Sequence, residues 1–462
     1  MKFSEYLNSL KGKRVAVVGA GISNTPLIES LLMAGINTAV CDRQTRDEIS
    51  TEILRFEESG AELRLGKEYL ENMDADIIFR TPGLMPSNHA LREAVLSGAL
   101  LTSEMEVFFK VCPCRIIAVT GSDGKTTTTS IISELLKKEG YTVHIGGNIG
   151  APLLCRADDI GPEDLAVIEL SSFQLITMGE SPDIAVVTNV SPNHLDIHSS
   201  MDEYIGSKRN IFIHQKSSGR VVLNFDDEIT RDFAGSAPGE ALFFSLREKV
   251  RDGVYAYNGK IYESIDGHSE EIMPYCDISL PGMHNVGNYM AAFAAVRGLV
   301  SYYSMRETAR TFSGVEHRIE FVDEIHGVRY YNDSIASSPT RAIAGLRSFN
   351  QKVILIAGGK GKGVGFDELG AEIVGHVKTL VLTGLTASMI RISVENAPDY
   401  EGSPEIIICE DFRDAVLYAA KSAGDGDIVL LSPACTSFDR FKNFEERGEF
   451  FKAIVRGMAI EN

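Results

Sequence analysis

The stretch VTGSDGKTTTT, residues 119–129, combines a lysine, glycines on both sides of it and a run of hydroxyl side chains. Glycines let backbone N–H groups approach an anion, and a helix that follows such a loop adds the positive end of its dipole. Lys125 can then reach the terminal phosphates of a nucleotide, and the Thr126 hydroxyl can bind Mg²⁺. Only the short pattern G-x-x-G-K-T is present, because Val119 replaces the first glycine of the full P-loop. The stretch predicts an ATP site, against the alternative of an ordinary glycine-rich turn.

Two polar residues lie at or just after the ends of strands that are expected downstream of this loop. Glu169 closes the apolar run LAVIEL, and His194 lies in VVTNVSPNHLD. Ligands of parallel sheets bind beyond the carboxyl ends of the strands, so both side chains are candidates for holding divalent cations against a triphosphate. For His194 the alternative is an ordinary solvated loop histidine.

A second glycine-rich turn, GAGISN at residues 19–24, resembles the dinucleotide fingerprint G-x-G-x-x-G. Asp42 follows at about the spacing of the acid that binds the ribose of NAD. The competing hypothesis from this turn is an NAD-dependent dehydrogenase. Asn24 speaks against it, because the third glycine position allows close packing of helix on strand and leaves no room for a side chain.

Parallel sheets are needed to bring these residues together, and the chain alternates apolar, β-branched runs with helical patterns throughout. We expect strands at Val15–Val18, Thr38–Cys41, Ile116–Thr120, Leu165–Leu170, Ile184–Val190, Val353–Ala357, Thr379–Leu382, Glu405–Cys409 and Ile428–Leu431, and helices near Pro26–Ala34, Thr127–Glu139 and Asn288–Leu299. Residues 217–280 look β-rich. The pattern predicts an α/β protein of three domains: a Rossmann-like N-terminal domain (1–110), a central P-loop ATPase-like parallel sheet (111–313) and a Rossmann-like C-terminal domain (314–462).

The composition limits the class of protein. The chain has 462 residues, of which 44% are apolar and 24% charged, as is typical of soluble globular proteins with more than one core. No apolar run is long enough for a membrane span, and the first residues contain no signal-peptide core. The formal charge of −19 argues against binding of nucleic acid or anionic membranes. The seven cysteines are scattered and complete no zinc site, which favours a reduced cytoplasm.

Taken together, the motifs resemble those of the Mur ligases, ATP-dependent amide ligases of peptidoglycan synthesis. The resemblance spans essentially the whole chain and rests on TGSDGKTTT (120–128), GGNIG (146–150), ELSSFQL (169–175), NVSPNHLD (189–196), LPGMHNVGN (280–288), GVEHRIE (314–320), YNDS (331–334) and SPACTSFDRFKNFEERG (432–448). It implies that ATP phosphorylates a carboxylate and that an amine attacks the resulting acyl phosphate. The implied substrates are UDP-N-acetylmuramoyl-L-alanine and D-glutamate, handled by a cytoplasmic monomer without nucleic-acid or membrane partners.

The resemblance also implies roles for individual residues. Lys208, in YIGSKRNIF, matches a lysine that is carbamylated in the family, and a carbamate suits Mg²⁺; without the family it would be taken for a solvated charge. The catalytic residues would be Lys125, Glu169, His194 and Lys208, and the ligands of two Mg²⁺ ions Thr126, Glu169, His194 and Lys208. ATP would contact Gly121, Ser122, Asp123, Gly124, Lys125, Thr126, Thr127, Asn288, Arg318 and Asp333. The UDP substrate would contact Ile22, Ser23, Asp42, Arg43, Asn148 and Ser171, and the amino acid Ser337, Lys362, Ser437 and Phe444.

Some alternatives stay open at this point. The neighbouring Lys360 competes with Lys362 for its role, and Phe444 could simply pack in a core. The family's usual NDSKAT is NDSIAS here, so Ile335 replaces a lysine and Ser337 a threonine. The lost cation weakens the case for an acidic amino acid, so ligases that add another amino acid remain alternatives. A non-catalytic ATP-binding protein is a third class, but it would not need Glu169, His194 and Lys208 together.

Overall fold

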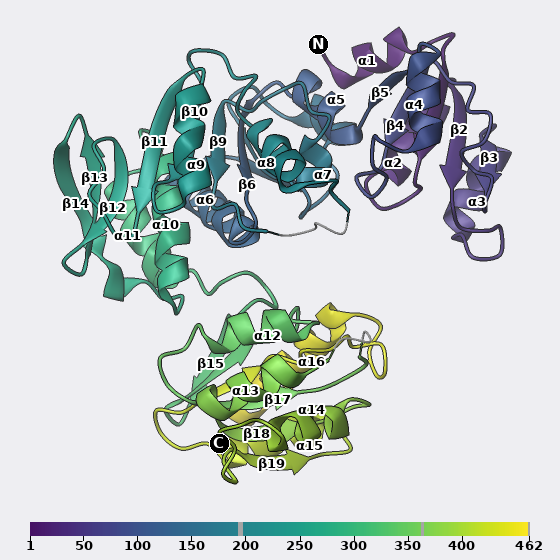
Figure 1. Ribbon diagram of the computed structural model, residues 1–462. Coiled ribbons are helices and arrows are strands. Elements are labelled where there is room, and N and C mark those ends of the chain that lie inside the picture. The colour runs from purple at the N-terminus through teal and green to yellow at the C-terminus, as the bar shows by residue number, and fades with distance from the viewer. Residues whose placement is uncertain (193–196, 362–364, 461–462) are drawn as a thin grey trace. The chain divides into compact units, whose positions relative to one another are not determined.

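The structure is a computed structural model that describes residues 1–192, 197–361 and 365–460 (Figure 1). These residues form three sheets, and the chain divides into two compact units. The first unit comprises Met1–Asp277 and Gly287–Thr308 and contains two of the sheets; the second comprises Ile278–Val286 and Ala309–Asn462 and contains the third. The expected mixed α/β architecture with parallel-rich sheets is confirmed. His194 and Lys362 lie outside the described residues.

The first sheet is entirely parallel, with strand order β3-β2-β1-β4-β5. Its central strand β1 buries Val15 to Val18, as a continuous apolar run predicts for a strand covered on both faces. The strands are β1 (Arg14–Val18), β2 (Asn37–Asp42), β3 (Glu62–Leu65), β4 (Ile77–Arg80) and β5 (Leu100–Thr102), and the helices α1 (Phe3–Ser9), α2 (Thr25–Met33), α3 (Thr51–Glu58), α4 (His89–Leu96) and α5 (Glu104–Val111).

The second sheet has the order β14-β13-β12-β11-β10-β9-β6-β8-β7 and is parallel from β7 to β12, with an antiparallel edge formed by β13 and β14. Its strands are β6 (Arg115–Thr120), β7 (Val143–Gly147), β8 (Leu165–Glu169), β9 (Ile184–Val187), β10 (Arg220–Asn224), β11 (Glu240–Ser245), β12 (Gly253–Tyr257), β13 (Lys260–Ile265) and β14 (His268–Pro274). Its helices are α6 (Lys125–Glu139), α7 (Ser172–Leu175), α8 (Met201–Arg209), α9 (Glu228–Phe233), α10 (Met283–Ala295) and α11 (Tyr302–Thr311), with short 3₁₀ turns η1 (Leu154–Asp159), η2 (Ala234–Ser236) and η3 (Tyr275–Asp277).

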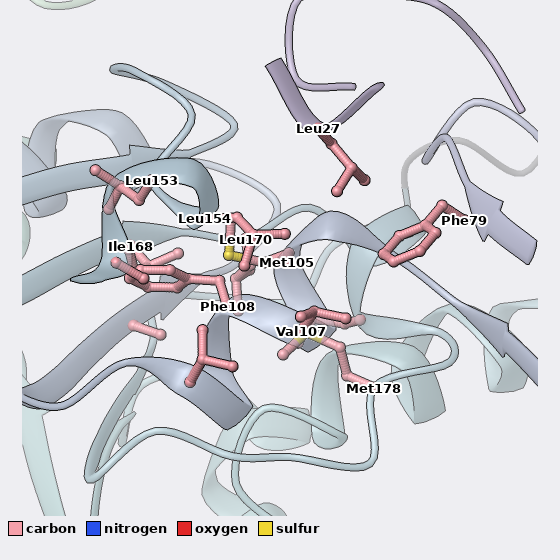
Figure 2. Packing of buried hydrophobic residues seen from close by; sticks show 14 of the residues in the cluster. Leu27, Phe79, Met105, Val107, Phe108, Leu153, Leu154, Ile168, Leu170 and Met178 are labelled. Atoms are coloured by element: carbon pink, nitrogen blue, oxygen red, sulfur yellow. The ribbon is translucent and has the colours of Figure 1, made fainter. Parts of the chain in front are cut away.

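One hydrophobic cluster joins these two sheets into a single unit. Figure 2 shows Leu27 of α2 and Phe79 of β4 close to the α5 side chains, among other buried apolar residues of the cluster: Met105, Val107, Phe108, Leu153, Leu154, Ile168, Leu170 and Met178. Helix α5 thus contributes to the packing of both sheets. The predicted boundary near residue 110 lies within this shared core, whereas the one near residue 313 lies close to the division between the two units.

Glu104, the first residue of α5, is a buried carboxyl in this region. Its Oε1 accepts a hydrogen bond from the Leu154 N–H, and burial raises its pKa from 4.5 to about 7. Between pH 4.5 and about 7, Glu104 is deprotonated in the unfolded chain but still protonated in the folded chain. The stability that this carboxyl contributes at low pH is therefore lost as the pH rises through 7. Glu104→Gln should therefore raise the free energy of unfolding at pH 8 by on the order of 1–3 kcal/mol, with little effect at pH 4.5.

Thermal unfolding at both pH values checks this prediction, with the exposed Glu29→Gln as the matched control. An equal change in melting temperature at pH 4.5 and pH 8 would contradict the assignment of the pH dependence to Glu104.

The third sheet has the order β15-β16-β20-β17-β18-β19 and is parallel except for β15. Its strands are β15 (Glu320–Ile325), β16 (Val328–Asn332), β17 (Val353–Ala357), β18 (Val377–Leu382), β19 (Glu405–Ile408) and β20 (Ile428–Leu431). Its helices are α12 (Pro339–Leu346), α13 (Asp367–His376), α14 (Ala387–Glu395), α15 (Phe412–Lys421) and α16 (Phe444–Ile460). Among the described helices of the whole chain, none is both long and apolar enough to cross a bilayer.

Of the nine strands expected individually, eight agree with the observed strands to within two residues at both ends, and the one expected at Ile184–Val190 ends earlier, at Val187. The strands β3, β4, β5 and β7 were not predicted. The helix expected at Asn288–Leu299 is α10, which begins at Met283, directly after Gly282 with φ +95°. The predicted start of α6 at Thr127 was two residues late, because Gly124 in the left-handed region sets the helix start at Lys125. The hairpin β15–β16 was not predicted, since its polar edge strand shows only partial burial.

Candidate active site

The predicted phosphate loop leaves β6 between the ends of two neighbouring strands. Val119 lies opposite Glu169 of β8, and Thr120 lies opposite Val187 of β9. The loop is held from the side of β9: Asn189 accepts hydrogen bonds from the Ser122 and Asp123 N–H groups through its carbonyl and its side-chain oxygen, each at 2.9 Å. These hydrogen bonds to the segment that follows β9 fix the backbone of the loop.

Gly121 occupies a position that no other residue fits. Its φ is +151°, and a Cβ there would lie 1.8 Å from Thr188 Oγ1, an atom that donates to the Asp123 carbonyl at 2.5 Å. Gly121→Ala should distort the loop, weaken ATP binding at least ~10-fold and destabilise the fold by about 1–3 kcal/mol. Nucleotide titration by calorimetry checks this, with Gly206→Ala as the control, since a Cβ at Gly206 meets nothing within 4 Å. Unchanged affinity in the Gly121 variant would contradict the role of this loop.

Two lysines converge on the first carbonyl of the loop. Lys125 Nζ donates to the Gly121 and Ser122 carbonyls at 2.9 Å each, and Lys208 Nζ of α8 donates to the same Gly121 carbonyl at 2.7 Å. Lys208 is 2% exposed, and burial together with the charge of Lys125 lowers its pKa from 10.5 to about 7. A large fraction of this amine is therefore neutral near physiological pH, which is unusual for lysine.

Tyr204 ties Lys208 to the loop. Its ring lies 4.6 Å from Lys208 Nζ, and its hydroxyl is 2.9 Å from Ser122 Oγ. Tyr204 and Lys208 are four residues apart on α8, so they share one helix face. Tyr204 was not predicted as a site residue from the sequence, although its spacing of four residues from Lys208 is a usable signal.

Glu169 offers a buried carboxylate oxygen to a ligand. Its Oε1 accepts from Asn148 Nδ2 at 2.9 Å, while its Oε2 is buried and has no hydrogen-bond partner among the residues that the structure describes. Divalent cations such as Mg²⁺ bind oxygen donors of this kind, and leaving the oxygen unpartnered costs free energy. Glu169, with the half-buried Thr126 on α6, thus fits a metal site. Asn148, expected at the UDP substrate, is here the partner of Glu169.

Asn288, predicted to contact ATP, lies next to the phosphate loop on α10. A Cβ added to Gly124 would lie 2.4 Å from Asn288 Oδ1, and Thr128 Oγ1 donates to the same oxygen at 3.4 Å. Thr127, which precedes Thr128 on α6, is buried. The structure therefore brings together the loop residues, Asn288, Glu169 and Lys208 within the first unit.

The turn after β1 is organised by Asp42. Its two carboxylate oxygens accept hydrogen bonds from the Ala20 and Gln44 N–H groups at 2.8 and 2.9 Å. Asn24 is buried and donates to the Gly19 carbonyl at 2.8 Å, so a side chain does fill the place of the third glycine. Ile22, Ser23 and Arg43 are exposed beside this turn. Ser171, also expected at the UDP substrate, caps α7 through a reciprocal pair of contacts with Gln174.

In the second unit, Asp333 lies directly after β16 and is 4% exposed. Burial raises its pKa to about 7, although the Ser432 hydroxyl donates to it at 2.7 Å and the charge of Arg318 opposes the shift. Its Oδ1 also accepts from the Ile319 N–H at 3.3 Å. Arg318 lies between His317 and Ile319, which both have positive φ angles, so a tight turn holds it near Asp333.

Arg447 connects the segments expected to bind the amino acid. This buried α16 side chain donates to Ser334 Oγ and to the carbonyls of Ser334 and Cys435 at 2.9, 2.8 and 3.1 Å. Ser334 Oγ in turn donates to the Phe444 carbonyl at 2.8 Å, and the Phe444 ring packs edge-on against His317. Ser437, two residues beyond Cys435, is buried, and Ser337 follows Ser334 by three residues. Arg447 was not predicted as a site residue from the sequence.

Comparison with known proteins completes the description of the site. Residues 119–296 match the Mur ligase middle domain, and residues 317–435 match the glutamate ligase domain of Mur ligases. The chain is 47% identical over 461 residues to a UDP-N-acetylmuramoylalanine–D-glutamate ligase of Ruminiclostridium cellulolyticum and 50% identical over 459 residues to one of Clostridium kluyveri; each match covers 99% of both chains.

Solved structures with a similar fold are more distant in sequence. A UDP-N-acetylmuramate–alanine ligase from Thermotoga maritima has a TM-score of 0.55 at 18% identity and covers 97% of this chain and 100% of its own. A UDP-N-acetylmuramoyl-L-alanyl-D-glutamate–2,6-diaminopimelate ligase has a TM-score of 0.57 at 19% identity, with 83% and 93% covered. At this level of identity the likeness concerns the fold.

Proposed function

The chain belongs to the Mur ligase family, and on this premise we propose that it joins D-glutamate to UDP-N-acetylmuramoyl-L-alanine in an ATP-dependent step of peptidoglycan synthesis. The observation that carries the proposal is the identity of 47–50% over 99% of the chain to relatives named for this reaction. The convergence of Lys125 and Lys208 on one loop carbonyl next to the strand that carries Glu169 supports ligase chemistry at this site.

A carboxylate is a poor electrophile, so the reaction needs an activation step. Transfer of the terminal phosphoryl group of ATP to the carboxylate of the UDP substrate makes an acyl phosphate, which the amine of D-glutamate attacks. The tetrahedral intermediate then collapses, and phosphate leaves. The N–H groups of the loop and the Lys125 ammonium would bind the phosphates and offset the repulsion between the two anions as they approach.

Mg²⁺ fits the donors of the site. Thr126, Glu169, His194 and a carbamate on Lys208 would hold two ions, which neutralise charge on the phosphates when bound. Two observations support this assignment: Glu169 Oε2 is buried and has no partner in residues 1–192, 197–361 and 365–460, and the pKa of Lys208 is low. The neutral Lys208 amine would attack CO₂, forming the carbamate and releasing one proton.

We further propose the three-domain division at residues 1–110, 111–313 and 314–462, and a monomer that acts in the cytoplasm. The first domain would bind the UDP group through Ile22, Ser23, Asp42 and Arg43, with Asn148 and Ser171 toward the sugar. Arg318 and Asp333 would bind the nucleotide, and Ser337, Lys362, Ser437 and Phe444 the amino acid. Exposure of Ile22, Ser23 and Arg43 around the Asp42 turn supports the first of these assignments.

ATP-dependent phosphate release with UDP-N-acetylmuramoyl-L-alanine and single amino acids tests the function. We expect release with D-glutamate and background rates with L-glutamate, L-alanine, meso-diaminopimelate and D-alanyl-D-alanine. Release with a different amino acid would reassign the acceptor site around Ile335 while keeping the ligase chemistry. If no amino acid supports phosphate release, the assignment of UDP-N-acetylmuramoyl-L-alanine as the substrate is wrong.

A further inference from the structure

Two cysteines lie in contact where the chain passes from the first sheet to the second. Cys112 directly follows α5, Pro113 comes next, and Cys114 directly precedes β6. Their sulfur atoms are 3.5 Å apart, and all seven cysteines of the chain are free thiols in the structure. A disulfide has its sulfur atoms ~2.05 Å apart, so closing this pair needs an approach of about 1.5 Å.

The two thiols differ in access and acidity. Cys112 is half-buried, whereas Cys114 is 7% exposed. The hydrogen bond between the sulfur atoms lowers the pKa of Cys112 and raises that of Cys114. Since the thiolate is the reactive form, Cys112 is the more accessible and more nucleophilic of the two thiols. Cys114 is in place to attack a mixed disulfide formed on Cys112.

We propose that Cys112 and Cys114 form a reversible dithiol–disulfide site that reacts with low-molecular-weight disulfides. The Cys112 thiolate attacks one sulfur of the small disulfide, whose S–S bond breaks and releases one thiolate. Cys114 then attacks the Cys112 sulfur of the mixed disulfide, a second small thiol leaves, and the Cys114 proton passes to the released thiolate. The two cysteines are oxidised by two electrons, and one small disulfide is reduced to two thiols.

The site is separate from the phosphate loop. Cys114 precedes the first residue of β6, and Gly121 follows the last, so the six residues of the strand separate them by roughly 20 Å. The thiol pair acts on the connection between α5 and β6 rather than on groups that bind substrate. Disulfide formation at this pair therefore does not depend on the proposed ligase activity.

The test uses the full-length protein and oxidised glutathione, with free thiols then blocked by N-ethylmaleimide and peptides mapped by mass spectrometry. We expect an intramolecular Cys112–Cys114 disulfide that dithiothreitol reverses, forming at least about 10-fold faster than a mixed disulfide at the exposed Cys276. Alkylatable Cys112 and Cys114 alongside a modified Cys276 would overturn the proposal.

Single variants separate the two roles. Cys114→Ser should trap glutathione on Cys112, because the resolving thiol is gone, whereas Cys112→Ser should leave Cys114 alkylatable. Cys276→Ser is the matched control and should leave disulfide formation unchanged. A Cys114→Ser protein that accumulates no mixed disulfide, although its melting temperature matches that of the wild type, would contradict the assignment of Cys112 as the attacking thiol.

Discussion

Replacing Lys125 with alanine should lower ATP-dependent phosphate release by at least ~10²–10³-fold, the range seen when one donor to a developing anion is removed. Lys125 Nζ already points back to the loop, where it donates to two carbonyls. Its ammonium is the loop cation best placed to offset the charge of a triphosphate. Steady-state phosphate release with both substrates saturating measures the loss.

The matched control is Lys138→Ala, an exposed lysine near the other end of the same helix α6, which should keep wild-type activity. Circular dichroism and the melting temperature establish that the Lys125 variant is folded. Activity within a few-fold of the wild type in a folded Lys125→Ala protein would contradict the assignment of the phosphate loop.

Replacing Lys208 with alanine should lower activity by about 10²-fold or more, and formate or acetate should restore part of it. The substitution removes the buried amine next to Gly121 that would carry the carbamate, and a small carboxylate can occupy the space left. Lys208→Arg is the sharper control, because it keeps a long basic side chain at this position but cannot form the carbamate. We expect the arginine variant to be inactive and not restored by either acid.

The low pKa of Lys208 gives this prediction a pH dependence. Only the neutral amine adds CO₂, and with a pKa of about 7 the amine is mostly neutral at pH 8 and mostly protonated at pH 6. At equal concentrations of dissolved CO₂, protein depleted of CO₂ should therefore regain activity faster at pH 8 than at pH 6. Full activity of Lys208→Ala without any added acid would refute the carbamate.

The local features of this protein could be predicted from the sequence because each depends on a few neighbouring residues. Apolar β-branched runs predicted the central strands β1, β6, β8, β17 and β20 and several of their neighbours, but not β3, β4, β5 or β7, and the glycines and lysine of residues 121–125 predicted the phosphate loop. The motifs also pointed to the correct family. Helix ends and the hairpin β15–β16 were harder to predict, because backbone turns at single glycines and a half-exposed edge strand leave only weak sequence patterns.

The chemical state of the site was decided only by tertiary structure. Lys208 looked like a solvated lysine in the sequence, yet it lies 87 residues from the carbonyl that it contacts, and only folding buries it beside Lys125. Likewise, Asn148, just after the neighbouring strand β7, donates to one oxygen of Glu169, while the other oxygen is buried without a partner within the described part of the chain. Burial and like-charge proximity set whether a group is ionised or unpartnered. Both depend on contacts between distant segments, which a local pattern does not contain.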